Sequence, residues 1–224
     1  MPEKHEKGGL SFTVARSEGT HICYILLPQG LRQDIEEFIG TASVRYRCHI
    51  VAVNGMEWND DMTPWPAEGV FRKAVPFGGK ADRFLARFRN LCLELEEELG
   101  IDASERWLAG ISLSGLFALW AAHSCDFFSG IACISGSFWY DGLDGWVAAN
   151  ELSPAVRFCH ISLGDREKNS KDRRMATVEE RTVAIVERLR SQGVHTDWQL
   201  IDGTHFSPVV PRLETALEAL NAAE

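Results

Sequence analysis

Short apolar runs alternate with helical patterns along this chain, and this alternation limits the possible folds more than any other feature. The runs are rich in β-branched and aliphatic residues and are typical of buried strands. They lie at 21–27, 48–53, 107–110, 130–135, 157–163 and 197–201. The clearest helical patterns lie between them, at 81–99 and 176–192. The pattern predicts an α/β fold, a single mostly parallel sheet with helices on both faces, whose ligands bind at the carboxyl ends of the strands.

Length and composition favour one soluble domain. The 224 residues can enclose one sizeable core, and no repeat or Pro-, Gly- or Ser-rich linker divides them. We therefore expect a single domain over 1–224, with about 1–9 flexible. The charged N-terminus and the absence of an apolar run of about 18 residues argue against a signal peptide or a membrane span. A cytoplasmic location is expected.

Charge and cysteine usage exclude several classes of function. A net charge of −9 argues against nucleic acid as a partner, because phosphate contacts need clustered Lys and Arg. The six cysteines lie mostly within apolar runs and lack the paired spacing of zinc sites, so we expect buried thiols in a reducing compartment. No metal or cofactor is expected. The sequence sets no oligomeric state, and a homodimer is one option.

The segment 107–119 has the pattern of a strand, a sharp turn and a helix, with Ser112 at the turn. A serine held there projects its hydroxyl above the end of the sheet, as a nucleophile requires. The usual pattern is G-x-S-x-G. Here Gly110 fits the pattern, Ser114 stands in place of the second glycine, and Gly115 follows one position later. An ordinary strand-to-helix turn is the alternative reading.

An activated serine needs a base, and the base needs a carboxylate to orient it. His205 follows the last predicted strand and precedes the final helix, which favours it as the base. The carboxylate is expected after the strand ending at 163, where Glu167 is preferred and Asp165 competes. Further candidates are Asp141, Asp144 and Asp202.

Two further sets of residues could complete an acyl-transfer site. The oxyanion donors would be the backbone N–H of Leu113 and one from the region Gln29, Gly30 and Leu31. A plain turn is the alternative reading of the second region. Tryptophans follow the predicted strands at the same edge, namely Trp58, Trp65, Trp139 and Trp146. They could form the wall of an apolar substrate pocket, or some could only anchor the loops.

With these motifs assembled, the chain resembles the putative esterase group of α/β-hydrolases, which contains enterochelin esterase and S-formylglutathione hydrolase. The resemblance rests on four segments: 109–115, 134–139, 162–168 and 203–206. It implies a metal-free serine esterase in which Ser112 attacks, His205 transfers the proton and Glu167 or Asp165 orients it.

The expected function is hydrolysis of a small-molecule carboxylic ester through an acyl-enzyme. Acyl transfer to an alcohol and thioester hydrolysis use the same residues and remain alternatives. A third alternative, from another class, is a catalytically silent binding protein that keeps the fold.

Overall fold

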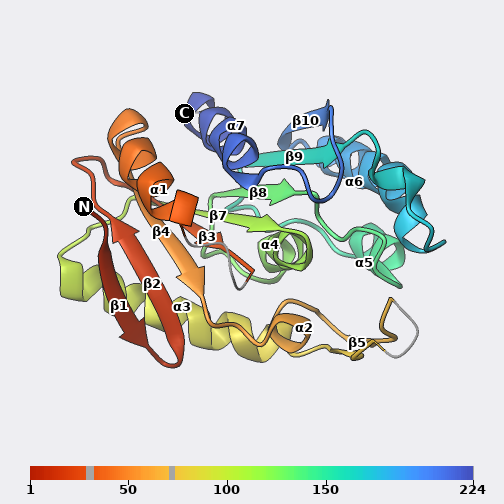
Figure 1. The fold of residues 1–224 in the computed structure, drawn as a ribbon, viewed down its shortest axis with the longest axis horizontal. Coiled ribbons are helices and arrows are strands. Elements are labelled where there is room, and N and C mark those ends of the chain that lie inside the picture. Colours follow the sequence, from red (N-terminus) through yellow and green to blue (C-terminus); the bar gives the residue numbers. More distant parts are fainter. Residues whose placement is uncertain (29–32, 71–73, 224) are drawn as a thin grey trace.

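A computed structural model describes residues 1–28, 33–70 and 74–223 (Figure 1). These residues form an eight-stranded sheet in the order β1-β2-β4-β3-β7-β8-β9-β10. The strands are β1 (Glu3–Lys7), β2 (Leu10–Ala15), β3 (His21–Leu26), β4 (Cys48–Asn54), β7 (Glu105–Ile111), β8 (Gly130–Ile134), β9 (Phe158–Gly164) and β10 (His195–Ile201). The strands from β4 to β10 in this order run parallel. The predicted mostly parallel sheet is confirmed.

Helices cover both faces of the sheet, as the alternation predicted (Figure 1). One face carries α1 (Gln33–Arg45) and α7 (Val209–Ala222). The other carries α3 (Ala81–Leu99), α4 (Leu113–Ser124), α5 (Leu143–Ala149) and α6 (Val178–Ser191). Short elements lie in the connections: α2 (Trp58–Asp61), β5 (Pro66–Ala67), β6 (Phe77–Gly78), η1 (Glu167–Asn169) and η2 (Met175–Thr177).

Helix α3 matches its predicted bounds because its apolar residues recur at helical spacing. Phe84, Phe88 and Leu95 are buried on one side of the helix, and Gly100 ends it with a φ of 63°. In contrast, α6 begins at Val178 and not at 176, because Met175–Thr177 forms a separate 3₁₀ turn. Such tight turns often precede a helix and cannot be distinguished from it by apolar spacing alone.

Glu3–Lys7, within the segment 1–9 that was expected to be flexible, form strand β1. This strand pairs antiparallel with β2 through a turn at Gly8 and Gly9, whose φ angles are 54° and 81°. Positive φ at two successive residues is the geometry of a tight hairpin turn. In β2, Leu10, Phe12 and Val14 are buried in the core shared with α3. Alternating apolar residues on β2, and not the charge of β1, decide the structure of this segment.

The parallel strands place their carboxyl ends at a common edge of the sheet. The loops after β7, β8, β9 and β10 meet there, and they carry Ser112, Ser135, Glu167 and His205. Over the ranges given above, no helix has the length and apolar character needed to cross a bilayer.

Candidate active site

Ser112 lies at the sharp turn between β7 and α4. Its φ of 63° and ψ of −122° place a non-glycine residue in a strained backbone conformation. The turn is tightly enclosed, because a Cβ added to Gly110 would lie 2.1 Å from the carbonyl oxygen of Ser114. This is the geometry that raises a serine hydroxyl above the end of a sheet.

Ser114 replaces the usual glycine without disturbing the turn, because its hydroxyl is fully hydrogen-bonded. Its Oγ accepts the N–H of Ile111 at 2.7 Å and lies 2.8 Å from the carbonyl oxygen of Leu26, to which it can donate. The Ser114 side chain is fully buried. The departure from the glycine pattern therefore joins the turn to the end of β3.

His205 connects Ser112 to a carboxylate. Its Nε2 lies 3.1 Å from the Oγ of Ser112, and its Nδ1 lies 2.8 Å from the Oε2 of Glu167. Because a carboxylate accepts hydrogen bonds, Nδ1 carries the proton and Nε2 is left to accept from the serine hydroxyl.

Glu167 is the most enclosed member of this group, with 3% of its side chain exposed. Its Oε1 accepts the N–H of Gly164 at 2.8 Å and the hydroxyl of Ser135. Burial by itself would raise the pKa of Glu167. The hydrogen bonds from His205 and Ser135 outweigh burial and hold that pKa below its ordinary value. Glu167 is therefore a buried carboxylate held in its ionised form.

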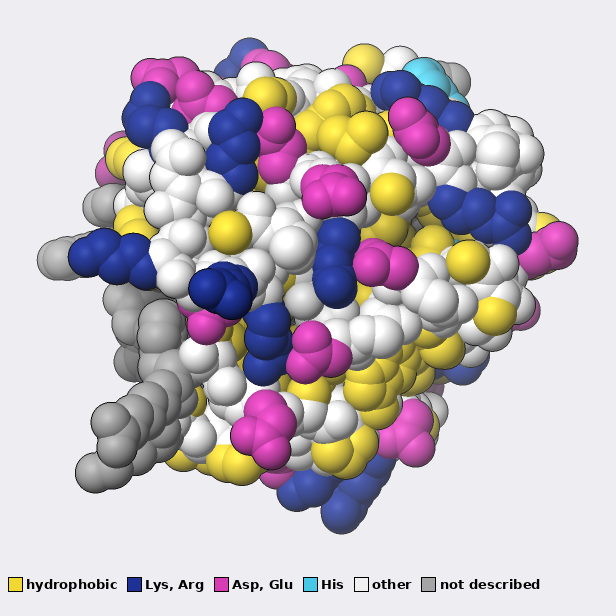
Figure 2. Space-filling model, turned by 90° about the vertical axis from the view of Figure 1, so that its right-hand side faces the viewer, with side chains coloured by type: hydrophobic (Ala, Val, Ile, Leu, Met, Phe, Trp, Pro, Cys, Tyr) yellow, Lys and Arg dark blue, Asp and Glu magenta, His cyan; other side chains and the backbone are white. Residues whose placement is uncertain are grey.

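Asp165, the competing acid, does not contact His205 in the structure. It accepts the N–H of Gly203 at 3.0 Å and so holds the loop that carries His205. The other carboxylates considered from sequence lie in ion pairs: Asp141 with Arg174, Asp144 with Arg181, and Asp202 with Arg166. Figure 2 shows the side of the molecule that lies at the right in Figure 1, where Lys and Arg are interspersed with Asp and Glu and form no extended area of one sign.

The structure describes one of the two predicted oxyanion donors. Leu113 is the first residue of α4, directly after Ser112, where a helix presents backbone N–H groups that lack partners within the helix. Gln29, Gly30 and Leu31 lie outside the described residues.

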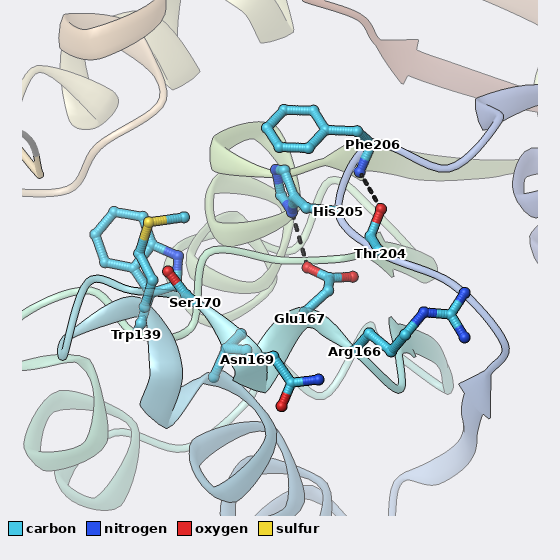
Figure 3. Close-up of a pocket in the computed structure, with 10 residues that line it drawn as sticks. Trp139, Arg166, Glu167, Asn169, Ser170, Thr204, His205 and Phe206 are labelled. Carbon is cyan, nitrogen blue, oxygen red and sulfur yellow. Dashed lines mark hydrogen bonds and ion pairs between the residues drawn. The ribbon is translucent and has the colours of Figure 1, made fainter.

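A pocket of about 180 Å³ opens beside His205 (Figure 3). Its apolar lining comes from Trp139, Met175, Val178 and Phe206. The polar residues that line it are Arg166, Glu167, Asn169, Ser170, Thr204 and His205. Trp139 is buried, with 5% exposed, whereas Phe206 is 92% exposed and stands edge-on to the ring of His205. The pocket therefore combines apolar and polar side chains, with an exposed aromatic side chain at its rim.

Of the predicted substrate-binding tryptophans, Trp139 lines this pocket. The indole N–H of Trp65 donates to the carbonyl oxygen of Asp141 at 2.8 Å, and its ring packs against Tyr140 and Trp146. Trp58 begins α2 and packs, half-buried, against the core. These contacts anchor the loops around the site.

Ser135 and Arg212 were not identified from the sequence as site residues. The guanidinium of Arg212 donates to the Oγ of Ser135, and its Nη2 lies 3.7 Å from the Oε1 of Glu167. A signal was present, because Arg212 shares the buried face of α7 with Leu213, Ala216 and Leu220. A cation on the apolar side of a helix needs a buried anionic or hydrogen-bonding partner.

Within 1–28, 33–70 and 74–223, no group of three or more His, Cys, Asp or Glu side chains is placed to hold a metal ion.

Sequence comparisons identify relatives over most of this chain. The family model described as "Putative esterase" matches residues 24–208. The uncharacterized protein YbbA of Bacillus subtilis (strain 168) is 26% identical over 208 residues, which cover 87% of this chain and 83% of that protein.

Solved structures of similar fold include proteins named as a serine hydrolase and as siderophore hydrolases. An IroE-like serine hydrolase from Shewanella oneidensis matches with a TM-score of 0.80 at 17% identity, over 99% of this chain and 80% of that chain. The siderophore hydrolase EstA from Aspergillus nidulans matches with a TM-score of 0.71 at 19% identity, over 99% and 93% of the two chains. The enterobactin hydrolase IroE, in complex with DFP, gives 0.66 at 21% identity, over 100% and 94%. At these identities the likeness shows the fold, and the predicted α/β-hydrolase fold is confirmed.

Proposed function

Because this chain belongs to the putative esterase family and is a carboxylic ester hydrolase, we propose that Ser112, His205 and Glu167 are the residues that carry out the hydrolysis. The observation that supports this assignment is the continuous hydrogen-bonded series from the Ser112 hydroxyl through His205 to Glu167. Such a series is the arrangement that makes a serine hydroxyl nucleophilic.

In the first half of the reaction, the Oγ of Ser112 attacks the ester carbonyl carbon while the Nε2 of His205 takes the hydroxyl proton. The carbonyl oxygen becomes an oxyanion, which the N–H of Leu113 is placed to stabilise. Glu167 stabilises the positive charge on His205. When the intermediate collapses, the carbon–oxygen bond to the alcohol breaks and His205 returns its proton to the departing oxygen.

In the second half, water takes the place of the alcohol. His205 removes a proton from water, the resulting oxygen nucleophile attacks the acyl group on Ser112, and the serine leaves with the proton. The carboxylic acid is then released. Acyl transfer would differ only in the use of an alcohol in place of water.

The pocket beside His205 suggests the substrate class. Its volume of about 180 Å³ and its apolar side chains favour a compact group. Trp139 and Phe206 are aromatic, and aromatic side chains favour flat apolar groups. Two of the structural relatives are named siderophore hydrolases, and another is named a ferulic acid esterase. We propose that one side of the ester is a compact aryl or alkyl group.

Labelling with a fluorophosphonate, followed by intact-mass measurement, tests the proposed nucleophile. The parent protein should gain one adduct, and Ser112→Ala and His205→Ala should gain none while keeping the parent's circular dichroism. Matched controls are Ser124→Ala, at the last turn of α4, and His195→Gln, at the start of β10. Both controls should label like the parent. A folded Ser112→Ala protein that still forms the adduct would refute the assignment.

A further inference from the structure

We propose that Arg212 is a positioning residue, which acts through Ser135 to hold Glu167 ionised and turned toward His205. The proposal deepens the function proposed above and depends on it, because it assigns a role relative to the same three residues. It adds two buried side chains, one from α7 and one from the loop after β8, to the structure that supports the carboxylate.

The hydrogen bonds between these side chains have a defined direction. A guanidinium only donates, so the Ser135 hydroxyl must accept from Arg212. Its own proton is then available to Glu167, and its Oγ does lie in hydrogen-bond contact with Oε1 of that carboxylate. Ser135 therefore passes the polarising effect of the cation on to Glu167.

The backbone around Ser135 keeps this hydroxyl in place. Ser135 has a φ of 46°, and its N–H donates to the carbonyl oxygen of Ser162 at 2.7 Å. Two residues later, the N–H of Ser137 donates to the carbonyl oxygen of Ser112 at 3.0 Å. The loop after β8 thus carries the hydroxyl that binds Glu167 and also contacts the residue proposed as nucleophile.

Burial makes the charge of Arg212 effective. Arg212 is 4% exposed, its Nη2 lies 3.7 Å from the Oε1 of Glu167, and water therefore screens the pair weakly. An isolated buried carboxylate would tend to take up a proton. Arg212 opposes that uptake, and so does each hydrogen bond to the ionised form.

Other charged groups on the elements around Glu167 form ion pairs of their own. From its own loop and from α6, β10 and α7, the ion pairs are Asp165 with Arg166, Lys168 with Glu179, His160 with Asp197, and Arg45 with Glu214 and Glu218. Among the described residues, the charges paired with Glu167 are those of Arg212 and, when protonated, His205.

The arrangement also restricts the orientation of Glu167. Oε1 accepts from both Ser135 and the N–H of Gly164, while Oε2 accepts from His205. A rotation of the carboxylate would break all three hydrogen bonds. Arg212 therefore contributes to position as well as to charge.

The test measures the rate of fluorophosphonate labelling as a function of pH, because this readout needs no natural substrate. Arg212→Met should label about 10- to 100-fold more slowly, at or below the lower end of the roughly 10²- to 10⁴-fold that a positioned general base contributes, because Arg212 acts on that base only through Glu167. The acid limb of its pH profile should move to higher pH, because the Glu167–His205 pair takes up a proton more readily without the cation. Arg212→Lys keeps the charge and should retain the parent's acid limb.

Arg106→Met is the matched control. Arg106 forms a half-buried ion pair with Glu96, which is 3% exposed and lies on α3, away from the site. Its loss should lower the melting temperature without moving the acid limb. If Arg212→Met lowers the melting temperature but leaves the limb in place, Arg212 is only structural and the proposal is overturned.

Ser135→Ala keeps the proposal testable should Arg212→Met not fold. It removes the hydroxyl that lies between Arg212 and Glu167 and keeps the cation. Labelling should therefore slow, and the acid limb of the pH profile should move to higher pH. An unchanged limb would overturn the proposal. The parent protein distinguishes a failure of this proposal from a failure of the proposed function. A parent that forms no adduct on Ser112 contradicts the proposed function itself.

Discussion

At the scale of single residues, two carboxylates in one loop have different surroundings. Glu167 accepts a hydrogen bond from His205, whereas Asp165 accepts one from the backbone of Gly203. They are two residues apart in the sequence, but their side chains contact different groups. The contacts allow their roles to be tested separately.

Glu167→Gln should slow fluorophosphonate labelling and ester turnover by about 10²- to 10⁴-fold, because an amide cannot stabilise the charge that His205 acquires. Asp165→Asn keeps an oxygen that can accept from Gly203 and should change either rate by less than about threefold. Initial rates on a short-chain aryl ester would check both. Equal large losses in the two variants would contradict the assignment of Glu167.

Phe206 is a second residue whose role can be tested alone, because it is 92% exposed and lies at the rim of the pocket. Phe206→Ala should raise KM for naphthyl acetate about three- to tenfold, as expected for the loss of roughly 1 kcal/mol of aromatic contact. It should leave kcat and the melting temperature near the parent values. Leu200→Ala, an exposed side chain on β10, is the control. An unchanged KM would remove Phe206 from the binding site.

At the scale of elements, the connection from β7 to α4 depends on close backbone contact. Gly110 lies against the first turn of α4, where an added Cβ would come 2.1 Å from the carbonyl oxygen of Ser114. That oxygen belongs to the backbone and cannot move without shifting the helix. The position of Ser112 therefore depends on a residue two places before it.

Gly110→Ala should destabilise the protein by about 3 kcal/mol, the upper part of the usual range for overpacking, and should abolish labelling of Ser112. Gly145→Ala is the matched control, because an added Cβ at Gly145 in α5 meets no atom within 4 Å. It should be neutral or slightly stabilising, since alanine favours a helix. Urea unfolding measures both. Normal stability and labelling in Gly110→Ala would show that the turn between β7 and α4 tolerates a side chain at position 110.

At the scale of the whole molecule, the ionised carboxylates link stability to pH. The pKa of Glu167 lies below its ordinary value of 4.5, so the folded state binds its proton less readily than the unfolded chain. The pKa of Asp197 is likewise lowered, first by its hydrogen bond with His160. For such groups, the stabilisation is present above the unfolded pKa and is lost as pH falls through the folded one.

The melting temperature should therefore fall as the pH is lowered from about 5 to 3. Glu167→Gln should show a shallower fall than the parent, because it no longer takes up this proton on unfolding. Glu37→Gln, at an exposed position of α1, should keep the parent's slope. Scanning calorimetry across this range checks the prediction. Equal slopes in the parent and in Glu167→Gln would contradict the linkage.

Much of the fold could be read from local sequence patterns. Apolar runs predicted the central strands, and helical spacing predicted α3 with its observed bounds. The small side chains around Ser112 predicted the turn. The hairpin β1–β2 was missed, because the charged residues of β1 hide a pairing that only the buried face of β2 makes favourable. Local patterns are reliable where burial is periodic and fail at a polar edge strand.

The site could be predicted in part. The order of Ser112, His205 and an acid after β9 followed from the sequence, because each follows a strand and parallel strands end at one edge. Which of the two carboxylates contacts His205 depends on the 3₁₀ turn at Glu167–Asn169, which directs one side chain inward. The contact of Arg212 with Ser135 joins α7 to the loop after β8 across 77 positions of sequence. The sequence by itself determined the fold class and the candidate residues, since both depend on local pattern and chain order. Only the tertiary structure decided which side chains meet, because hydrogen bonds between distant loops depend on how the sheet and helices bring them together.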